Sequence, residues 1–338
     1  MFNDSYTHSR KADGILGNGV LAVVLTACAL CWGACYVDSV GYPVTDKEAV
    51  TPLWSAFCDM LKGKTQAYLL GMLLTAGGAF LLHRASYAMV LIRENTRLPL
   101  LFYILLISTN LSFLPIKSTS FGVFFLIFAL YELFTSYHDT GAWSKAFNVG
   151  LLLGAGSLLW TQLLWFLPVF WIGMYIFMSL GGRTLFATLA GVITVYWLLL
   201  GWCFFEGNYA PFTDTFPEMF RVSPLAFSDV ATETLIEIGV GTLLAVVSVV
   251  NIALHDIDNR RRARHYLLFT TILAAWSYAL YFLFDQVAEE FLMTTCVPVS
   301  ILIGHFFTSV RNRFVTWLFY ATVTLFIALL FLRLWNFL

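Results

Sequence analysis

The sequence predicts an all-α integral membrane protein, a single domain of residues 1–338 that crosses the bilayer about 11 times. Of its 338 residues, 59% are hydrophobic and only 12% are charged, whereas soluble domains carry about 25% charged residues. Long uncharged runs also recur along the whole chain, each close to the roughly 20 residues that a transmembrane helix needs. Lys and Arg residues flank these runs unevenly, which predicts their orientation.

Nine runs have the length and composition of single membrane helices. The first follows a polar N-terminal stretch without an A-x-A-like cleavage site, so we expect it to be retained as a span. The nine runs are residues 16–37, 66–83, 98–114, 120–137, 184–205, 232–254, 266–285, 291–308 and 314–336.

The stretch from Ala146 to Gly182 contains no charged residue and is too long for one span. As a straight helix it would measure about 55 Å, at about 1.5 Å per residue, against a hydrocarbon core of about 30 Å. Two short spans fit, with a break near Thr161-Gln162 and a weak point at Pro168, which lacks a backbone donor. We therefore predict a helical hairpin packed through glycines, which are Gly150, Gly154 and Gly156.

The distribution of Lys and Arg favours the hairpin independently. With two spans in this stretch and the N-terminus inside, 13 of the 19 Lys and Arg residues lie inside and 5 outside, with Arg333 in the last span. With one span, 7 lie inside and 11 outside, which violates the positive-inside rule. The sequence thus predicts an inside N-terminus, an outside C-terminus, and long outer loops at residues 38–65 and 206–230.

Three cysteines, Cys28, Cys31 and Cys35, share one face of the first span because of their helical spacing. No histidine joins them and the stretch is otherwise apolar. We therefore favour a packing face of small residues over metal ligation. The sequence specifies neither a metal nor a cofactor.

The first outer loop carries Asp38, Asp46 and Glu48. Membrane glycosyltransferases that use polyprenyl-phosphate sugars keep an essential acid in this loop, where it acts as a general base, sometimes through a metal. These three acids are therefore catalytic candidates if the protein is such a transferase. The alternative is that they are solvated loop charges, which are common in any outer loop.

Glu233 and Glu237 lie one turn apart at the outer start of the span at 232–254 and face the same way. They would repel each other if exposed, so a cation or a positive partner would relieve them. The positive end of the helix dipole is the simpler account and is preferred here. Acids near span ends are expected to stay within reach of water, and the scarcity of deep carboxylates argues against an ion-coupled transporter.

The segment HDIDNRRRARH carries Arg260, Arg261, Arg262 and Arg264 on the predicted inner side. Such clusters determine topology and attract anionic lipid headgroups. The chain has no Gly-rich phosphate loop, dinucleotide fingerprint or H-E-x-x-H pattern. Its net charge of −1 provides no general attraction for nucleic acid.

The region from 50 to 200 carries a family resemblance. It contains the pattern F-x-x-G-x-x-x-G-x-x-S-L at Phe147, Gly150, Gly154 and Ser157-Leu158, preceded by ENTRLP and followed by an aromatic span. This stretch resembles an uncharacterised Bacteroidota family of polytopic inner-membrane proteins. The family's Arg-rich turn is reduced here to GGRT at Arg183. The architecture is also loosely similar to polyprenyl-phosphate-dependent glycosyltransferases.

Three functions are consistent with these observations. The first is an envelope assembly or partner-binding component of the bacterial inner membrane, with lipids and envelope proteins as partners. The second is a lipid-linked glycan transferase that binds a polyprenyl-phosphate lipid and uses an outer-loop acid. The third is a transporter, which requires a central polar pathway.

Overall fold

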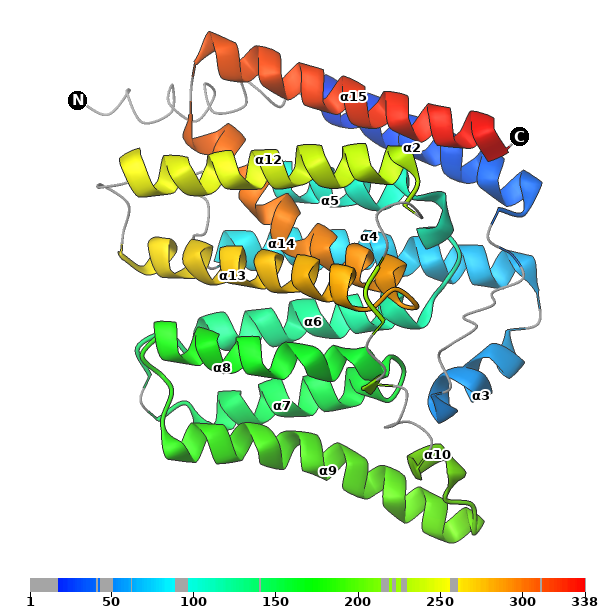
Figure 1. Ribbon diagram of the computed structural model, residues 1–338, viewed down its shortest axis with the longest axis vertical. Coiled ribbons are helices and arrows are strands. Elements are labelled where there is room, and N and C mark those ends of the chain that lie inside the picture. The colour runs from blue at the N-terminus through cyan, green and yellow to red at the C-terminus, as the bar shows by residue number, and fades with distance from the viewer. Residues whose placement is uncertain are drawn as a thin grey trace.

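The protein is an all-α helical bundle, which confirms the all-α part of the predicted fold class (Figure 1). The computed structural model describes residues 18–40, 42, 51–61, 63–88, 97–139, 141–213, 219–220, 223–225, 230–255, 261–310 and 312–337. In these residues the extended structure is limited to an isolated bridge between Ser223 and Phe284. Most of the long helices lie side by side with roughly parallel axes, α15 and α2 at one edge and α9 at the other, and α14 runs obliquely between them (Figure 1).

Eight helices of the described chain are long and apolar enough to cross a membrane. They are α2 Asn18–Asp38, α4 Lys64–Ala88, α6 Ser118–Thr135, α9 Gly182–Glu206, α12 Thr232–His255, α13 Arg261–Leu283, α14 Ala288–Ser309 and α15 Arg313–Phe337. The shorter elements are α3 Pro52–Met60, α5 Leu98–Thr109, η1 Leu111–Phe113, α7 Trp143–Ser157, η2 Thr161–Phe166, α8 Leu167–Ile176 and α10 Ala210–Thr213. The 3-10 helix η2 and α8 together form a further apolar segment.

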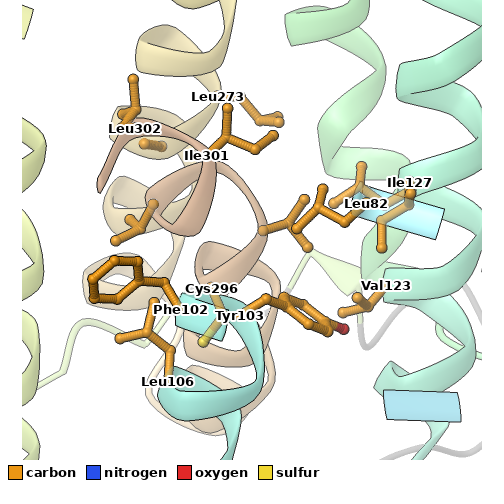
Figure 2. Packing of buried hydrophobic residues seen from close by; sticks show 14 of the residues in the cluster. Leu82, Phe102, Tyr103, Leu106, Val123, Ile127, Leu273, Cys296, Ile301 and Leu302 are labelled. Carbon is orange, nitrogen blue, oxygen red and sulfur yellow. The ribbon is translucent and has the colours of Figure 1, made fainter. Parts of the chain in front are cut away.

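Helix α14 is the centre of the bundle. In its most apolar stretch 94% of the residues are buried, because α5, α6, α12, α13 and α15 all pack against it. Figure 2 shows Cys296, Ile301 and Leu302 of α14 beside Phe102 and Tyr103 of α5. The hydroxyls of α14 donate to carbonyls of their own helix, as at Thr294, Thr295 and Ser300. These three hydroxyls are therefore satisfied within α14 itself.

The charge-free stretch folds back on itself, as predicted. Helix α7 ends at Ser157, the chain turns at residues 158–160, and η2 leads into α8. The amide of His138, before α7, donates to the carbonyl of Phe177, after α8, at 2.9 Å. The two ends of the stretch therefore meet at one end of the bundle, and the turn comes just before the predicted Thr161-Gln162 break.

The prediction that these glycines pack the two halves of the hairpin together was wrong for Gly150 and Gly154, which contact α9 instead. An added Cβ at Gly150 would lie 1.9 Å from the carbonyl oxygen of Thr188, and one at Gly154 would meet Val192, both on α9. Of the three glycines, only Gly156 faces the return of the hairpin, where it meets Leu163. A small-xxx-small face allows close backbone approach, and here it joins α7 to α9 rather than to α8.

The contacts between helix ends define two ends of the bundle. At the first, which we name the Asp38 end, α2 ends beside the start of α4, where Lys64 donates to the carbonyl of Val37 at 3.0 Å. Lys117 and Glu289 also pair there, at 3.2 Å. At the opposite end, which we name the Arg262 end, Tyr266 donates to the carbonyl of Phe134 at 2.8 Å. These are the right and left sides of Figure 1.

The three cysteines of α2 are buried packing residues. Cys28, Cys31 and Cys35 are each at most 2% exposed, and they join hydrophobic clusters with side chains such as Leu111 and Leu330. No group of three or more metal-ligating side chains occurs among the described residues. The arrangement agrees with the packing interpretation of this face.

Thiol labelling checks this packing. In the folded protein, N-ethylmaleimide should label Cys58, which is partly exposed, and leave Cys28, Cys31 and Cys35 unmodified. Burial excludes the reagent from the thiols on α2. Intact-mass spectrometry before and after unfolding in SDS measures the number of labels, and rapid native labelling of α2 would contradict the packing described.

Candidate functional site

A buried ion pair lies at the Asp38 end, between α12 and α15. Glu237 stands in the second turn of α12, and Arg333 is near the end of α15. The two helices run in opposite directions, so the start of one meets the end of the other. Arg333 Nη1 lies 3.1 Å from Glu237 Oε2, and the side chains are 9% and 3% exposed.

Helix α5 contacts both members of the ion pair through its last residue, Thr109. This helix ends at Thr109 inside the protein, and the last carbonyls of a helix have no amide partner within the helix. Arg333 Nη1 donates to the Thr109 carbonyl at 2.6 Å, and the Thr109 hydroxyl donates to Glu237 Oε1 at 2.8 Å. Arg333 Nη2 donates to the Thr234 hydroxyl at 2.8 Å. A cation at a helix C-terminus is also favoured by the helix dipole.

We name these four residues, Thr109, Thr234, Glu237 and Arg333, the polar cluster. An unpaired charge in such an apolar interior would be strongly destabilising. Charge pairing and hydrogen bonds to both partners offset that cost. The polar cluster therefore ties the ends of α5, α12 and α15 together.

A small cavity borders the polar cluster. Its volume is about 10 Å³, which is room for about one water molecule. Its lining includes Glu237, Tyr278, Thr295 and Cys296. A second cavity, beside Lys145 and Thr184 at the Arg262 end, has no room for a water molecule. Neither of these two cavities can hold a sugar or a lipid headgroup.

The expectation that Glu237 stays within reach of water was wrong, and so was the preference for the helix dipole as its main stabiliser. Its carboxylate is buried and paired with a cation from the far end of the sequence. Glu233, in the first turn of α12, is only half-buried. The two acids are therefore in different environments despite their shared face.

Of the three acids predicted in the first outer loop, only Asp38 lies among the described residues. Asp38 is the last residue of α2 and is exposed, and it lines neither cavity. Lys64, beside the end of α2, donates to Val37 and Ser39. Asp46 and Glu48 lie outside the described residues. A catalytic role for these acids stays a prediction.

The arginine cluster is at the other end of the bundle. Arg262 and Arg264 are exposed on the first turn of α13, Arg261 begins that helix, and Arg260 lies outside the described residues. The structure therefore separates Asp38 and Glu237 from Arg262 and Arg264 by the length of the helices.

Sequence reasoning placed Arg333, the cation of the polar cluster, in the last span but did not identify it as a site residue. The signal was present, because Arg333 is the only charged residue within the last apolar run, and ionisable residues in spans are functional candidates by default. The pairing of Arg333 with Glu237 could not be identified from the sequence, because the two residues are about a hundred positions apart. Only the packing of α12 against α15 brings them together.

The fold and this cluster define a class, a multi-helix bundle of membrane-length apolar helices stabilised by an internal ion pair. The chain matches no protein-family model, and no curated protein or solved structure is significantly similar to it.

Proposed function

We propose that the protein spans the bacterial inner membrane 11 times, with its N-terminus inside. The support comes from the eight long apolar helices together with α5, α7 and α8, which lie parallel to them (Figure 1). The excess of Lys and Arg at the Arg262 end supports the orientation. Lipid would cover exposed apolar side chains such as Trp197 and Phe205 of α9.

Cysteine accessibility tests this topology. In a chain whose native cysteines are replaced, Asp38→Cys should react with a membrane-impermeant maleimide added to intact spheroplasts, and Arg264→Cys should react only after the membrane is permeabilised. Both native side chains are exposed, so each position is reachable from its own side. Labelling of position 264 from outside would overturn the orientation.

We propose further that the protein is an assembly or partner-binding component of the cell envelope. The observation that supports this most is the close packing around α14, where the hydroxyls of Thr294 and Thr295 bond within their own helix. The buried charges of the polar cluster likewise bond to each other. Such an interior favours a scaffold over a protein that moves or converts a substrate.

The alternative is a lipid-linked glycan transferase, which would need Asp38, Asp46 or Glu48 beside a lipid-accessible cavity on the outer face. The position of Asp38 at the outer end of α2 is compatible with it. A transporter is the least favoured, because α14 is closely packed and the cavity beside it has room for only about one water molecule. Membership of the Bacteroidota family that the sequence resembles would fit an envelope location for either leading candidate.

Isolation in native lipid discs distinguishes these functions. The partner-binding proposal expects the full chain to be extracted with an envelope protein at fixed stoichiometry, measured by intact mass spectrometry. The transferase alternative instead expects sugar transfer from a polyprenyl-phosphate sugar, lost in an Asp38→Asn, Asp46→Asn or Glu48→Gln variant. Isolation of the chain with lipid alone would contradict the partner-binding proposal.

A further inference from the structure

An aromatic and basic cluster at the Arg262 end joins α13 to the turn after α6. Arg262 Nε donates to the hydroxyl of Tyr266 at 2.6 Å, and Tyr266 is itself buried and donates to the Phe134 carbonyl. The guanidinium carbon lies 5.3 Å from the ring centroid of Tyr137 and 5.6 Å from that of Tyr266. An exposed arginine is thus held in place by two tyrosines.

Other basic side chains gather around the same tyrosine. Tyr137 OH lies 3.1 Å from His265 Nδ1, and its ring meets the ring of His138 at 4.6 Å between centroids. His138 and Arg264 are close enough to His265 to interact with it electrostatically. Two segments, the turn at residues 136–139 and the first turn of α13, therefore bring four basic side chains together.

Carboxylates of the described chain do not neutralise this cluster. Asp139, in the same turn, accepts from Lys145 at 3.3 Å and from the amide of Gly141 at 3.0 Å. Asp256 and Asp258 lie outside the described residues. The Nη groups of Arg262 have no hydrogen-bond partner among the described residues, which leaves up to four N–H donors for a ligand.

We propose that Arg262, with His265, His138 and Arg264, binds the phosphate of an anionic phospholipid headgroup. A planar guanidinium suits the paired oxygens of a phosphate. The candidate membrane span of α13 begins at Arg262. If α13 crosses the membrane, the cluster therefore lies at the level of the headgroups, which tyrosines also favour. This inference rests on the proposed membrane topology and is independent of any protein partner.

The proposal differs from a general attraction between positive loops and acidic lipids. Tyr266 holds the arginine through Nε, and the turn after α6 contributes a histidine. His138 adopts a left-handed conformation, with φ of 58°, and its amide donates to Phe177 at 2.9 Å. The geometry thus depends on several segments folding together, which a run of arginines alone would not require.

Native mass spectrometry of the full chain, titrated with phosphatidylglycerol or phosphatidylethanolamine, tests the site. We expect preferential binding of phosphatidylglycerol, weakened about tenfold by Arg262→Gln, because a charge-assisted hydrogen bond is lost. The matched control is Arg313→Gln. Arg313 is exposed on the first turn of α15 at the same end, with no aromatic contact among the described residues. The Arg313→Gln substitution should change the affinity for phosphatidylglycerol by less than twofold.

Two further arms test whether the tyrosine-held geometry and the lipid itself are required. Tyr266→Phe keeps the ring and removes the hydroxyl that holds Arg262, so we expect a several-fold loss of lipid affinity with unchanged helix content. Inorganic phosphate, added in excess, should fail to displace the lipid. Equal losses of lipid affinity in Arg262→Gln and Arg313→Gln would overturn the site. Equal binding of phosphatidylglycerol and phosphatidylethanolamine would also overturn it. Displacement of the lipid by inorganic phosphate would overturn the assignment of the site to lipid.

Discussion

Replacing Arg333 by methionine is expected to lower the free energy of unfolding by about 3–5 kcal/mol, the cost of leaving one member of a buried ion pair without its partner. Methionine fills much of the same space but cannot neutralise Glu237 or donate to Thr109 and Thr234. The measurement is unfolding by SDS in mixed micelles, followed by circular dichroism of the full chain.

The double variant Glu237→Gln with Arg333→Met should be more stable than Arg333→Met alone, because its buried charge is gone. A matched surface comparison is Glu289→Gln. It removes one partner of the Lys117–Glu289 pair at the same end of the bundle, where Glu289 is 60% exposed. That change should cost less than about 1 kcal/mol. Equal costs for Arg333→Met and Glu289→Gln would show that the polar cluster is not a buried structural pair.

Substitution of Gly150 by alanine is expected to destabilise the protein by about 3 kcal/mol, at the upper end of typical overpacking costs. The new methyl group would lie 1.9 Å from the backbone oxygen of Thr188, which cannot rotate away as a side chain can. Helices α7 and α9 must separate, and the hydrogen bond between Ser157 and Tyr196 at 2.9 Å would weaken with them. The same SDS titration reports the change.

Gly201→Ala in α9 is the matched control, since an added Cβ there meets no atom within 4 Å. Alanine favours a helix over glycine by up to about 1 kcal/mol, so this variant should be neutral or more stable. The two substitutions are chemically identical and should differ in sign. A Gly150→Ala variant as stable as Gly201→Ala would contradict the close α7–α9 approach.

The Gly150 and Gly154 pattern shows how far a motif can be read without a structure. The spacing predicted that one face of the helix allows close packing, and the structure has such a face. It could not identify the partner, because a small-residue face accepts any helix of suitable shape. The residues on α9 that complete the contact, Thr188 and Gly191, carry no distinctive signal of their own.

Glu237 and Asp38 differ in a similar way. Both were identified from sequence as acids at outer span ends, and both lie at the Asp38 end of the bundle. One is buried against Arg333 and the other is exposed. Hydropathy gives the depth of a residue along its own helix. It does not give the direction in which the side chain points relative to other helices, and that direction decides whether an acid meets water or a cation.

The sequence by itself determined that this chain is a bundle of apolar helices and that residues 146–182 form a hairpin, because length and hydropathy act locally along the chain. It also identified the residues of the arginine cluster. Tertiary structure alone decided that α14 is the centre, that α9 packs on α7, and that Glu237 pairs with Arg333. It also brought His138 and Tyr137 to Arg262. These contacts join residues far apart in sequence, and in an apolar environment the helices choose neighbours by shape and by the need to satisfy buried polar groups.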